Sequence, residues 1–344
     1  MKKITINTGE SHSEIIIGGK WADAAALVPA GKTVIVTDEN ILRIYGEQFP
    51  RFPVFTIKPG ESSKSLSTIE ELARRMLDAG VDRSGYILGI GGGVVCDISG
   101  FLASVYMRGI KFGFVSSSIL SQVDASVGGK NGVNLDKTKN IIGTFSQPEF
   151  VICDPAMLLT LPEDEYLSGL AELIKMGAIL SSSLLALIEQ SKESILRRDI
   201  SLLELLVYES VRLKASVVSE DEKESGKRMV LNFGHTFGHV IEAVTGQKHG
   251  FAIAAGMEIA AAVSVMESLL GEADSKYLVN LLRDFNLLKE NNVSPETYAR
   301  MIISDKKRSG EDISFILLES PGKAVVKKIP VKKLADYCHS IRFR

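Results

Sequence analysis

The alternation of short apolar runs with helical patterns in the first half of the chain constrains its fold most strongly. Five runs rich in β-branched and aromatic residues end near Gly, Pro or Asp and are predicted to be buried strands: 33–38, 52–57, 85–93, 110–117 and 150–154. Residues 65–80 have helical periodicity, a Ser-rich start and Gly80 as the C-terminal cap. This alternation predicts a mainly parallel α/β sheet with a ligand site at the carboxyl ends of its strands.

The character of the sequence changes after Leu161-Pro162. Long helical periodicities follow at 163–180, 183–197, 201–226 and 251–271, joined by short polar links. We therefore predict two domains, an α/β domain over 1–161 and a mostly α-helical domain over 162–344. Two late β-like runs, ISFILLE and AVVKKI, interrupt the helical pattern, and the sequence does not place them.

Charge and cysteine usage exclude several classes of function. The formal net charge of -2, with both signs interspersed, provides no basic footprint for nucleic acid or for an anionic membrane. The three cysteines lack CxxC spacing, so neither a disulfide framework nor a thiolate metal site is indicated. The start MKKITINTGE turns polar at once, unlike a signal peptide, and no apolar run approaches the ~20 residues that span a bilayer. We expect a soluble cytoplasmic protein.

Three consecutive glycines end the run at 85–93, in LGIGGGVVCDISGF, where a helix is predicted to begin. Glycines there allow the backbone to approach a pyrophosphate closely, and a helix N-terminus stabilises its charge. Asp38 ends an upstream strand at a position suited to ribose hydroxyls, and KPGESSKS adds Glu61 and Lys64. These features favour a dinucleotide, although the glycines alone are also typical of a tight strand-to-helix turn.

A second glycine-rich segment, SQVDASVGGKNGVN (121–134) with KTKN (137–140), carries Asp124, Lys130, Lys139 and Asn140. A loop rich in backbone N–H groups and lysines suits a phosphate or another anion. The competing interpretation is a solvated loop.

Three of the five histidines lie within fifteen positions, around LNFGHTFGHVIE. His235 and His239 are four residues apart and should share one helix face. GLAELIK adds Glu172 and Lys175, which alone would be an ordinary surface pair. One carboxylate with two imidazoles is a common ligand set for catalytic zinc. Geometry alone proposes His235 and His239 as the zinc pair, and the choice among these two and His249 stays open at this level. The alternative is that the two histidines are satisfied by ordinary hydrogen bonds.

Taken together, these motifs resemble the 3-dehydroquinate synthase family. The matching pieces are PGESSKSL, GGGVVCDISGF, YMRG, SQVDASVGGKNGVN, KNIIGTF, TLP, GLAELIK, KASVVSEDEKESGKRMVLNFGHTFGHVIE, HG and DKK, in family order from about residue 59 to 307. The resemblance implies an NAD-binding N-terminal domain (1–161), a metal- and substrate-binding helical C-terminal domain (162–344) and an active site in the cleft between them. It also implies a homodimer, with Arg108 reaching the partner's phosphate site.

The resemblance further implies a role for individual residues. The metal ligands match Glu172, His235 and His249, whereas His239 serves the substrate phosphate. The positions implied to contact NAD are Asp38, Glu61, Lys64, Gly92, Gly93, Val94, Asp97, Ser117, Ser118, Lys130, Lys139 and Thr160. Those implied for substrate and catalysis are Arg108, Asp124, Lys130, Asn140, Lys175, Lys214, Glu224, Arg228, Asn232, His239 and Lys306.

The implied reaction converts 3-deoxy-D-arabino-heptulosonate 7-phosphate to 3-dehydroquinate and phosphate, a step of the shikimate pathway. It proceeds by transient oxidation with NAD, phosphate elimination, re-reduction and intramolecular aldol closure. The implied cofactors are NAD and zinc, with cobalt as a substitute in vitro. The alternatives are a sister sugar-phosphate cyclase with another substrate, a glycerol dehydrogenase-like NAD- and metal-dependent alcohol dehydrogenase, and a catalytically silent NAD-binding protein on the same scaffold.

Four positions depart from the family's usual pattern. Ser116 stands where Pro is common, and Cys96 replaces a frequent Gly. Asn131 replaces Thr in the GGKTG pattern. Phe251 follows HG where an acidic residue is frequent, so it could alter the surroundings of His249.

Overall fold

The computed structural model describes the whole chain except residues 10, 137, 304–307, 310 and 341–344. The described residues form two compact units, each treated by itself below. Unit 1 comprises Met1–Leu161 and Ile200–Lys223, and unit 2 comprises Pro162–Asp199 and Glu224–Arg344. Helix α7 (Ile200–Glu220) therefore belongs to unit 1, although its sequence falls inside the range predicted for the second domain. The reason is its packing against β1 (Lys2–Thr8) and the turn at Ser121–Ala125.

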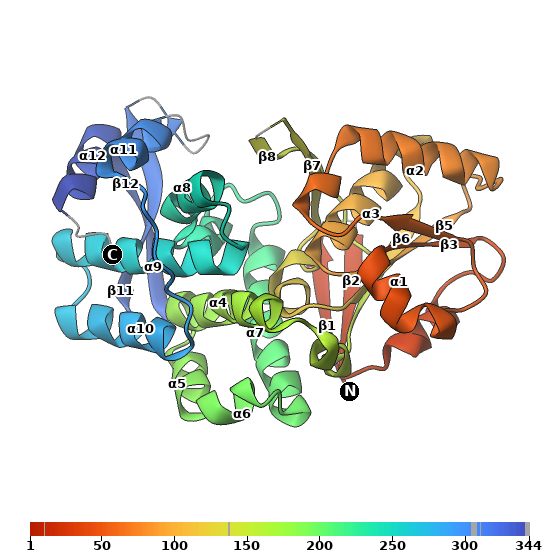
Figure 1. Cartoon of the computed structure of the whole chain (residues 1–344), viewed down its shortest axis with the longest axis horizontal. Helices are drawn as coiled ribbons and strands as arrows, with labels where there is room; N and C mark the ends of the chain where they lie inside the picture. Colours follow the sequence, from red (N-terminus) through yellow and green to blue (C-terminus); the bar gives the residue numbers. More distant parts are fainter. Residues whose placement is uncertain (10, 137, 304–307, 310, 341–344) are drawn as a thin grey trace. The chain divides into compact units, whose positions relative to one another are not determined.

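Unit 1 contains a seven-stranded sheet with the strand order β1-β2-β9-β6-β5-β3-β4 (Figure 1). The remaining strands are β2 (Ser11–Ile17), β3 (Thr33–Asp38), β4 (Val54–Ile57), β5 (Tyr86–Gly91), β6 (Lys111–Ser116) and β9 (Phe150–Cys153). Only β1 and β2 pair antiparallel within it, and all other pairs are parallel. The predicted mainly parallel sheet is confirmed, and all five predicted strands exist. The β1–β2 hairpin was not predicted.

Helices and short turns connect these strands. They are η1 (Trp21–Leu27), α1 (Glu39–Tyr45), η2 (Gly46–Gln48), η3 (Glu61–Ser63), α2 (Leu66–Asp78), α3 (Gly93–Val105), η4 (Tyr106–Arg108), η5 (Ser121–Ala125) and η6 (Pro155–Thr160). The predicted helix at 65–80 is α2, capped by the Ser65 side chain, and the predicted third β-run ends early because Gly92 caps α3. The sheet core includes Ile35, Leu88 and Val115, each fully buried.

The glycine-rich segment after β6 is not a plain loop. It forms the π-helical turn η5 and a two-stranded hairpin of β7 (Lys130–Leu135) and β8 (Thr138–Phe145). The hairpin packs against α3, and a Cβ atom on Gly100 of that helix would lie 1.9 Å from the Asn131 side chain. The prediction of a loop was wrong here because cross-strand pairing and packing on α3 order these polar residues.

Unit 2 is mostly helical. Its helices are α4 (Glu163–Leu180), α5 (Ser182–Gln190), α6 (Lys192–Leu196), η7 (Lys227–Asn232), α8 (His235–Thr245), α9 (His249–Met266), α10 (Glu272–Asp284), α11 (Pro295–Ile303) and α12 (Val331–Ser340). The two unplaced β-like runs pair as β11 (Asp312–Ser320) and β12 (Lys323–Pro330), with β10 (Arg308–Ser309) beside them. Helix α9 is long and apolar enough to cross a membrane, but 72% of it is buried within the structure, as in a core helix.

Close glycine packing sets the distance between α8 and α9. Gly234, at φ +78°, caps the start of α8, and a Cβ atom added to Gly256 of α9 would lie 2.0 Å from the Gly234 carbonyl oxygen. Any larger residue at Gly256 would therefore push the helices apart. This contact fixes the N-terminus of α8 against α9, and His235 is the first residue of α8.

Candidate active site

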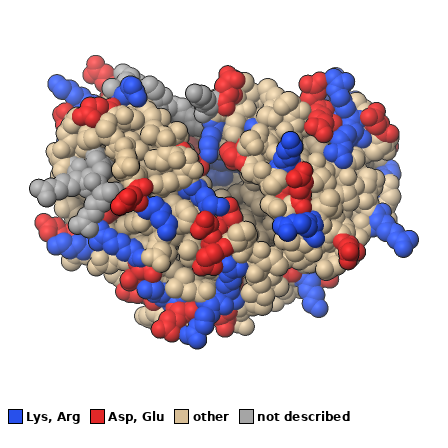
Figure 2. Space-filling view, in the orientation of Figure 1, with Lys and Arg blue, Asp and Glu red and all other residues tan. Residues whose placement is uncertain are grey.

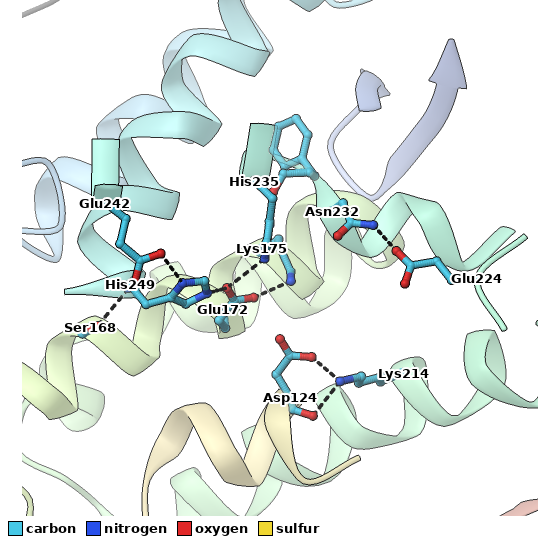
Figure 3. Close-up of polar contacts among 12 residues, drawn as sticks. Asp124, Ser168, Glu172, Lys175, Lys214, Glu224, Asn232, His235, Glu242 and His249 are labelled. Carbon is cyan, nitrogen blue, oxygen red and sulfur yellow. Dashed lines mark hydrogen bonds and ion pairs between the residues drawn. The ribbon is translucent and has the colours of Figure 1, made fainter. Parts of the chain in front are cut away.

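Three side chains that the sequence singled out converge in unit 2 (Figure 3). Glu172 comes from α4, and His235 and His249 are the first residues of α8 and α9. One ligand atom from each lies within 4.8 Å of the others. Glu172 Oε1 is 3.8 Å from His235 Nε2 and 3.3 Å from His249 Nε2. These separations are close to the ~3.3 Å expected between ligands of a tetrahedral zinc ion.

Outer partners orient both imidazoles. His235 Nδ1 lies 3.1 Å from the Phe233 carbonyl oxygen, which can only accept, so Nδ1 carries a proton. In the neutral ring, Nε2 then has the lone pair that a metal ion would bind. His249 Nδ1 lies 3.4 Å from Glu242 Oε2. Such second contacts are a regular feature of histidines that bind metal. The sequence analysis did not identify Glu242. The only feature that could have indicated it is its position three residues after His239, on the same face of α8.

The surroundings of His249 favour positive charge. Burial alone would lower the pKa of His249, but hydrogen bonds to Glu172 and Glu242, together with their charges, outweigh burial and raise that pKa to about 9. The same two carboxylates would stabilise a bound cation. Lys175 forms an ion pair with Glu172, and both side chains are buried, at 1% and 0% exposed. The alternative of an ordinary surface pair is therefore wrong.

His239 lies beside this group, with its ring centroid 5.3 Å from that of His235, so the two do share a face of α8. A second set of possible ligands combines His239, Glu242 and His249. His239 is exposed, whereas His235 and Glu172 are buried. The set centred on Glu172 is the better-shielded of the two.

Unit 2 holds other residues implied for the substrate. Arg228 of η7 is buried at 2% exposed. Asn232, at the end of η7, donates from Nδ2 to Glu224 Oε1 (Figure 3). Glu224 has a left-handed backbone, with φ 58°. Lys306 lies outside the described residues.

In unit 1, the glycine turn leads directly from β5 into α3. Gly92 is the N-cap of α3 and Gly93 its first residue, followed by Val94. A Cβ atom on Gly92 would lie 3.3 Å from Ser118 Oγ, and the Ser117 N–H donates to the Gly91 carbonyl at 2.9 Å. A larger residue at Gly92 would require the Ser118 side chain of the β6–η5 segment to shift.

Asp38 and Thr160 lie at the ends of other elements in unit 1. Asp38 Oδ1 accepts from the N–H groups of Asn40 and Ile41, at 2.8 and 3.0 Å, and caps α1. Burial raises the pKa of Asp38 despite those bonds. Because β3 and β5 are adjacent and parallel, Asp38 and Gly92 follow strand ends at the same edge of the sheet. Thr160 Oγ1 lies 3.0 Å from the Tyr45 hydroxyl.

Lys64 is the centre of a polar network on the same unit. Its ammonium donates to Asp97 Oδ2 and to Asn140 Oδ1, both at 2.5 Å, and lies 3.7 Å from Glu61 Oε1. Burial alone would lower the pKa of Lys64, but Asp97 and Glu61 outweigh it and raise that pKa, so Lys64 stays charged. The structure thus brings together residues from η3, α3 and β8 that the sequence related only by resemblance.

Other implied residues lie elsewhere in unit 1. Lys214 of α7 donates to the Asp124 carboxylate and, at 2.6 Å, to its carbonyl oxygen (Figure 3). Lys130 begins β7 and is exposed, and Lys139 of β8 is half-buried. Arg108 is exposed at the end of η4, with φ 71°.

Local contacts explain how the structure accommodates the four residues that depart from the usual family pattern. The Ser116 carbonyl accepts from Gln122 Nε2 at 2.9 Å, which holds the backbone that proline would otherwise stiffen. Cys96 is 1% exposed, and burial raises the pKa of its thiol, so it is an unreactive core residue. Asn131 Nδ2 donates to the carbonyls of Gly129 and Ser146. The Phe251 ring is buried beneath Lys289.

Comparison with known proteins identifies the family. The model for the 3-dehydroquinate synthase N-terminal part matches residues 54–168, and the model for the C-terminal part matches residues 169–308. The chain is 40% identical over 337 residues to the 3-dehydroquinate synthase of Halorhodospira halophila, and the match covers 95% of each chain. The chain belongs to the 3-dehydroquinate synthase family. The family resemblance drawn from the motifs, and with it an enzyme of the phosphate-eliminating lyase class, is confirmed.

Two further matches agree with membership of the 3-dehydroquinate synthase family. The 3-dehydroquinate synthase of Alkaliphilus metalliredigens is 36% identical over 354 residues, covering 99% of each chain. The crystal structure of 2-deoxy-scyllo-inosose synthase complexed with carbaglucose-6-phosphate, NAD+ and Co2+ is 26% identical, with a TM-score of 0.88 over 98% of this chain and 100% of that one. The predicted fold class is therefore confirmed.

Proposed function

We propose that this chain is a 3-dehydroquinate synthase that converts 3-deoxy-D-arabino-heptulosonate 7-phosphate to 3-dehydroquinate and phosphate. The observation that carries the proposal is the near-full-length match to 3-dehydroquinate synthases, combined with the Glu172–His235–His249 group. Identity to the inosose synthase is lower, at 26%, which favours this substrate over that of a sister cyclase.

Glu172, His235 and His249 would hold a divalent ion, zinc by the chemistry of one carboxylate and two imidazoles. NAD supplies a reversible oxidation and the ion supplies Lewis acidity when both are bound. Phe233 and Glu242 keep the imidazoles oriented, and Lys175 shares the Glu172 carboxylate. His239 is not one of the proposed metal ligands. It is exposed, one helical turn from His235, and would bind the substrate phosphate.

In unit 1 we assign NAD to the edge of the sheet where β3 and β5 end. Asp38 would bind ribose hydroxyls through its carboxylate, and Gly92 and Gly93 would let the pyrophosphate approach the start of α3. The charged Lys64, with Lys130 of β7 and Lys139 of β8, would attract the anionic ligands. Positioning by several rigid contacts is a large part of what such a site contributes to catalysis.

We also propose a homodimer in the cytoplasm. Apolar side chains are exposed at the C-terminal end of α3 and on the β7–β8 hairpin: Val105 at 45%, Leu135 and Ile141 at 47%, and Phe145 at 48%. A hydrogen bond between the Ser104 and Thr144 hydroxyls joins α3, which ends at Val105, to β8, which carries Ile141 and Phe145. Exposed apolar groups of this kind suit an interface with a second copy. All three cysteines are buried free thiols, which suits a reducing compartment.

The test is a reaction of the purified protein with zinc, catalytic NAD+ and 3-deoxy-D-arabino-heptulosonate 7-phosphate, following phosphate and 3-dehydroquinate. We expect many turnovers per NAD+ and no net NADH. Absence of phosphate release despite bound zinc and NAD would indicate a sister cyclase, to be tried with other sugar phosphates. NADH that accumulates with a simple polyol would indicate an alcohol dehydrogenase instead.

A further inference from the structure

Asn134 joins two groups of predicted ligand-binding residues and is not itself among the residues predicted to bind NAD or substrate. Its side-chain Nδ2 donates to Glu61 Oε1 at 2.9 Å, and its Oδ1 accepts from the Asn140 N–H at 2.8 Å. Its own backbone N–H donates to the Lys64 carbonyl at 2.8 Å. One residue of β7 therefore holds the η3 turn on one side and β8 on the other.

The backbone explains why a side chain is needed at this point. In the β7–β8 hairpin, Val133 pairs with Ile142 and Leu135 pairs with Thr138, so a bulge in β8 lies opposite Asn134. Asn140 lies within that bulge in a left-handed conformation, at φ 52°. A bulge takes backbone groups out of the ladder. The Asn134 amide oxygen accepts the N–H of Asn140 there and stabilises the bulge.

The bulge in turn aims the Asn140 side chain. Its Oδ1 accepts from the Lys64 ammonium, and since an ammonium can only donate, the amide oxygen must face Lys64. The network is then closed: Asn134 holds Glu61 and Asn140, and Lys64 joins Asn140 to Asp97.

We propose that Asn134 is a positioning residue that couples the cofactor-side turn of Glu61 and Lys64 to the substrate-side residue Asn140. This inference rests on the proposed function, because it takes Glu61 and Lys64 as NAD contacts and Asn140 as a substrate contact. The inference adds Asn134 to the proposed active site. It also explains why the β7–β8 hairpin has a bulge, since the bulge positions Asn140.

Variants of Asn134 separate its two bonds. N134A removes both, so we expect the Kd for NAD and the KM for the substrate each to rise about tenfold. N134D keeps an oxygen for the Asn140 N–H but cannot donate to Glu61, so the Kd for NAD should rise while the KM stays near that of wild type. The exposed Thr138 of the same hairpin provides T138A as the control, which should change neither value.

A swapped pair tests the coupling itself. In the E61Q/N134D double variant, the glutamine amide can donate to the aspartate, which restores the bond with its polarity reversed. We expect the change from Asn to Asp at 134 to raise the Kd for NAD less in E61Q than in wild type. Equal effects in both backgrounds, or a uniform loss in N134A and N134D that follows their melting temperatures, would overturn the proposal.

NAD binding is measured by calorimetry, without turnover. If the wild-type protein binds NAD but has no synthase activity, the proposed reaction fails, whereas the two Kd comparisons still decide the role of Asn134 at the cofactor turn. If it does not bind NAD at all, the role of Asn134 is overturned as well.

Discussion

His235 and His239 lie one turn apart on α8, yet their surroundings differ. His235 is buried, with Nδ1 committed to the Phe233 carbonyl and Nε2 facing Glu172, whereas His239 is exposed. A metal ion needs neutral imidazoles whose orientation is fixed, so the buried histidine is the better ligand. Glu242 fixes the orientation of His249 in the same way.

We therefore expect H235A and H249A to lose bound zinc, with affinity reduced at least about 100-fold, because each removes one of three protein ligands. H239A should retain zinc but lose turnover. Metal content after dialysis, measured by atomic emission, checks this together with the synthase assay. H12A is the control, since His12 is exposed on β2 in unit 1.

The opposite pattern, with zinc lost from H239A and retained in H249A, would show that the two histidines of one helix face form the zinc pair.

At this scale spacing alone indicated the residue types of a metal site, and the grouping of Glu172, His235 and His249 came only from the family resemblance. The carboxylate and the imidazoles were found from spacing, yet spacing favoured His239, since i,i+4 geometry reports only what one helix presents. The convergence of α4, α8 and α9 depends on long-range packing through residues such as Gly256, which local pattern does not encode. Asn134 was likewise invisible because its role depends on a bulge.

At the scale of elements, the C-terminal hairpin and α12 are tied to α9 by one carboxylate. Glu267 follows α9 and is 4% exposed, and it forms ion pairs of 2.7 Å with Lys327 of β12 and Lys333 of α12. The Tyr337 hydroxyl donates to it at 2.6 Å. Hydrogen bonds from Lys327, Lys333 and Tyr337 lower the pKa of Glu267 to about 2.

This lowered pKa predicts how stability depends on pH. The carboxylate contributes fully above its ordinary pKa of about 4.5, and the contribution is lost as the pH falls from there to about 2. We expect E267Q to lower the free energy of unfolding at pH 6 by about 1–3 kcal/mol, and the difference from wild type to shrink toward pH 3. Urea unfolding between pH 6 and pH 3 measures it.

The matched control for E267Q is E319Q, which removes a partly exposed ion pair with Lys323 on the same hairpin. We expect it to change stability by less than about 1 kcal/mol. A difference between E267Q and wild type that did not shrink on acidification would show that Glu267 stabilises the hairpin by packing and not by its charge.

Elements were predicted best where neighbouring residues decide them. Strand β3 and helix α4 match their expected bounds, because burial pattern and capping are local. The late runs that became β11 and β12 could not be placed, since a hairpin's packing partners, here Ser264 of α9 bonded to the Leu318 N–H, lie far away in sequence. The polar β7–β8 hairpin was mistaken for a loop because it lacks an alternating apolar pattern.

At the scale of the whole molecule, the charges of both signs are interspersed over the face shown in Figure 2. The residues proposed for the two cofactors also come from different units. The predicted NAD contacts lie in unit 1, between Asp38 and Thr160, and the metal ligands lie in unit 2. The sequence indicated a division into two domains but not the assignment of α7 to unit 1, because Lys214 of α7 bonds to Asp124, which lies ninety positions earlier in the sequence.

This separation predicts that each cofactor protects its own unit. A ligand that binds only the folded state stabilises it by about 2.7 kcal/mol at one hundred times its Kd, and the effect on local opening is largest where it binds. NAD should slow amide hydrogen exchange at the β5–α3 turn in metal-free protein, and zinc should slow it at Glu172, His235 and His249 without NAD. Mass spectrometry of peptides from chelated, zinc-loaded and NAD-loaded protein measures both.

H235A should lose the zinc response and keep the NAD response. If chelation abolished the protection by NAD, the cofactor would depend on the metal ion, and assignment of NAD to residues of unit 1 alone would be wrong.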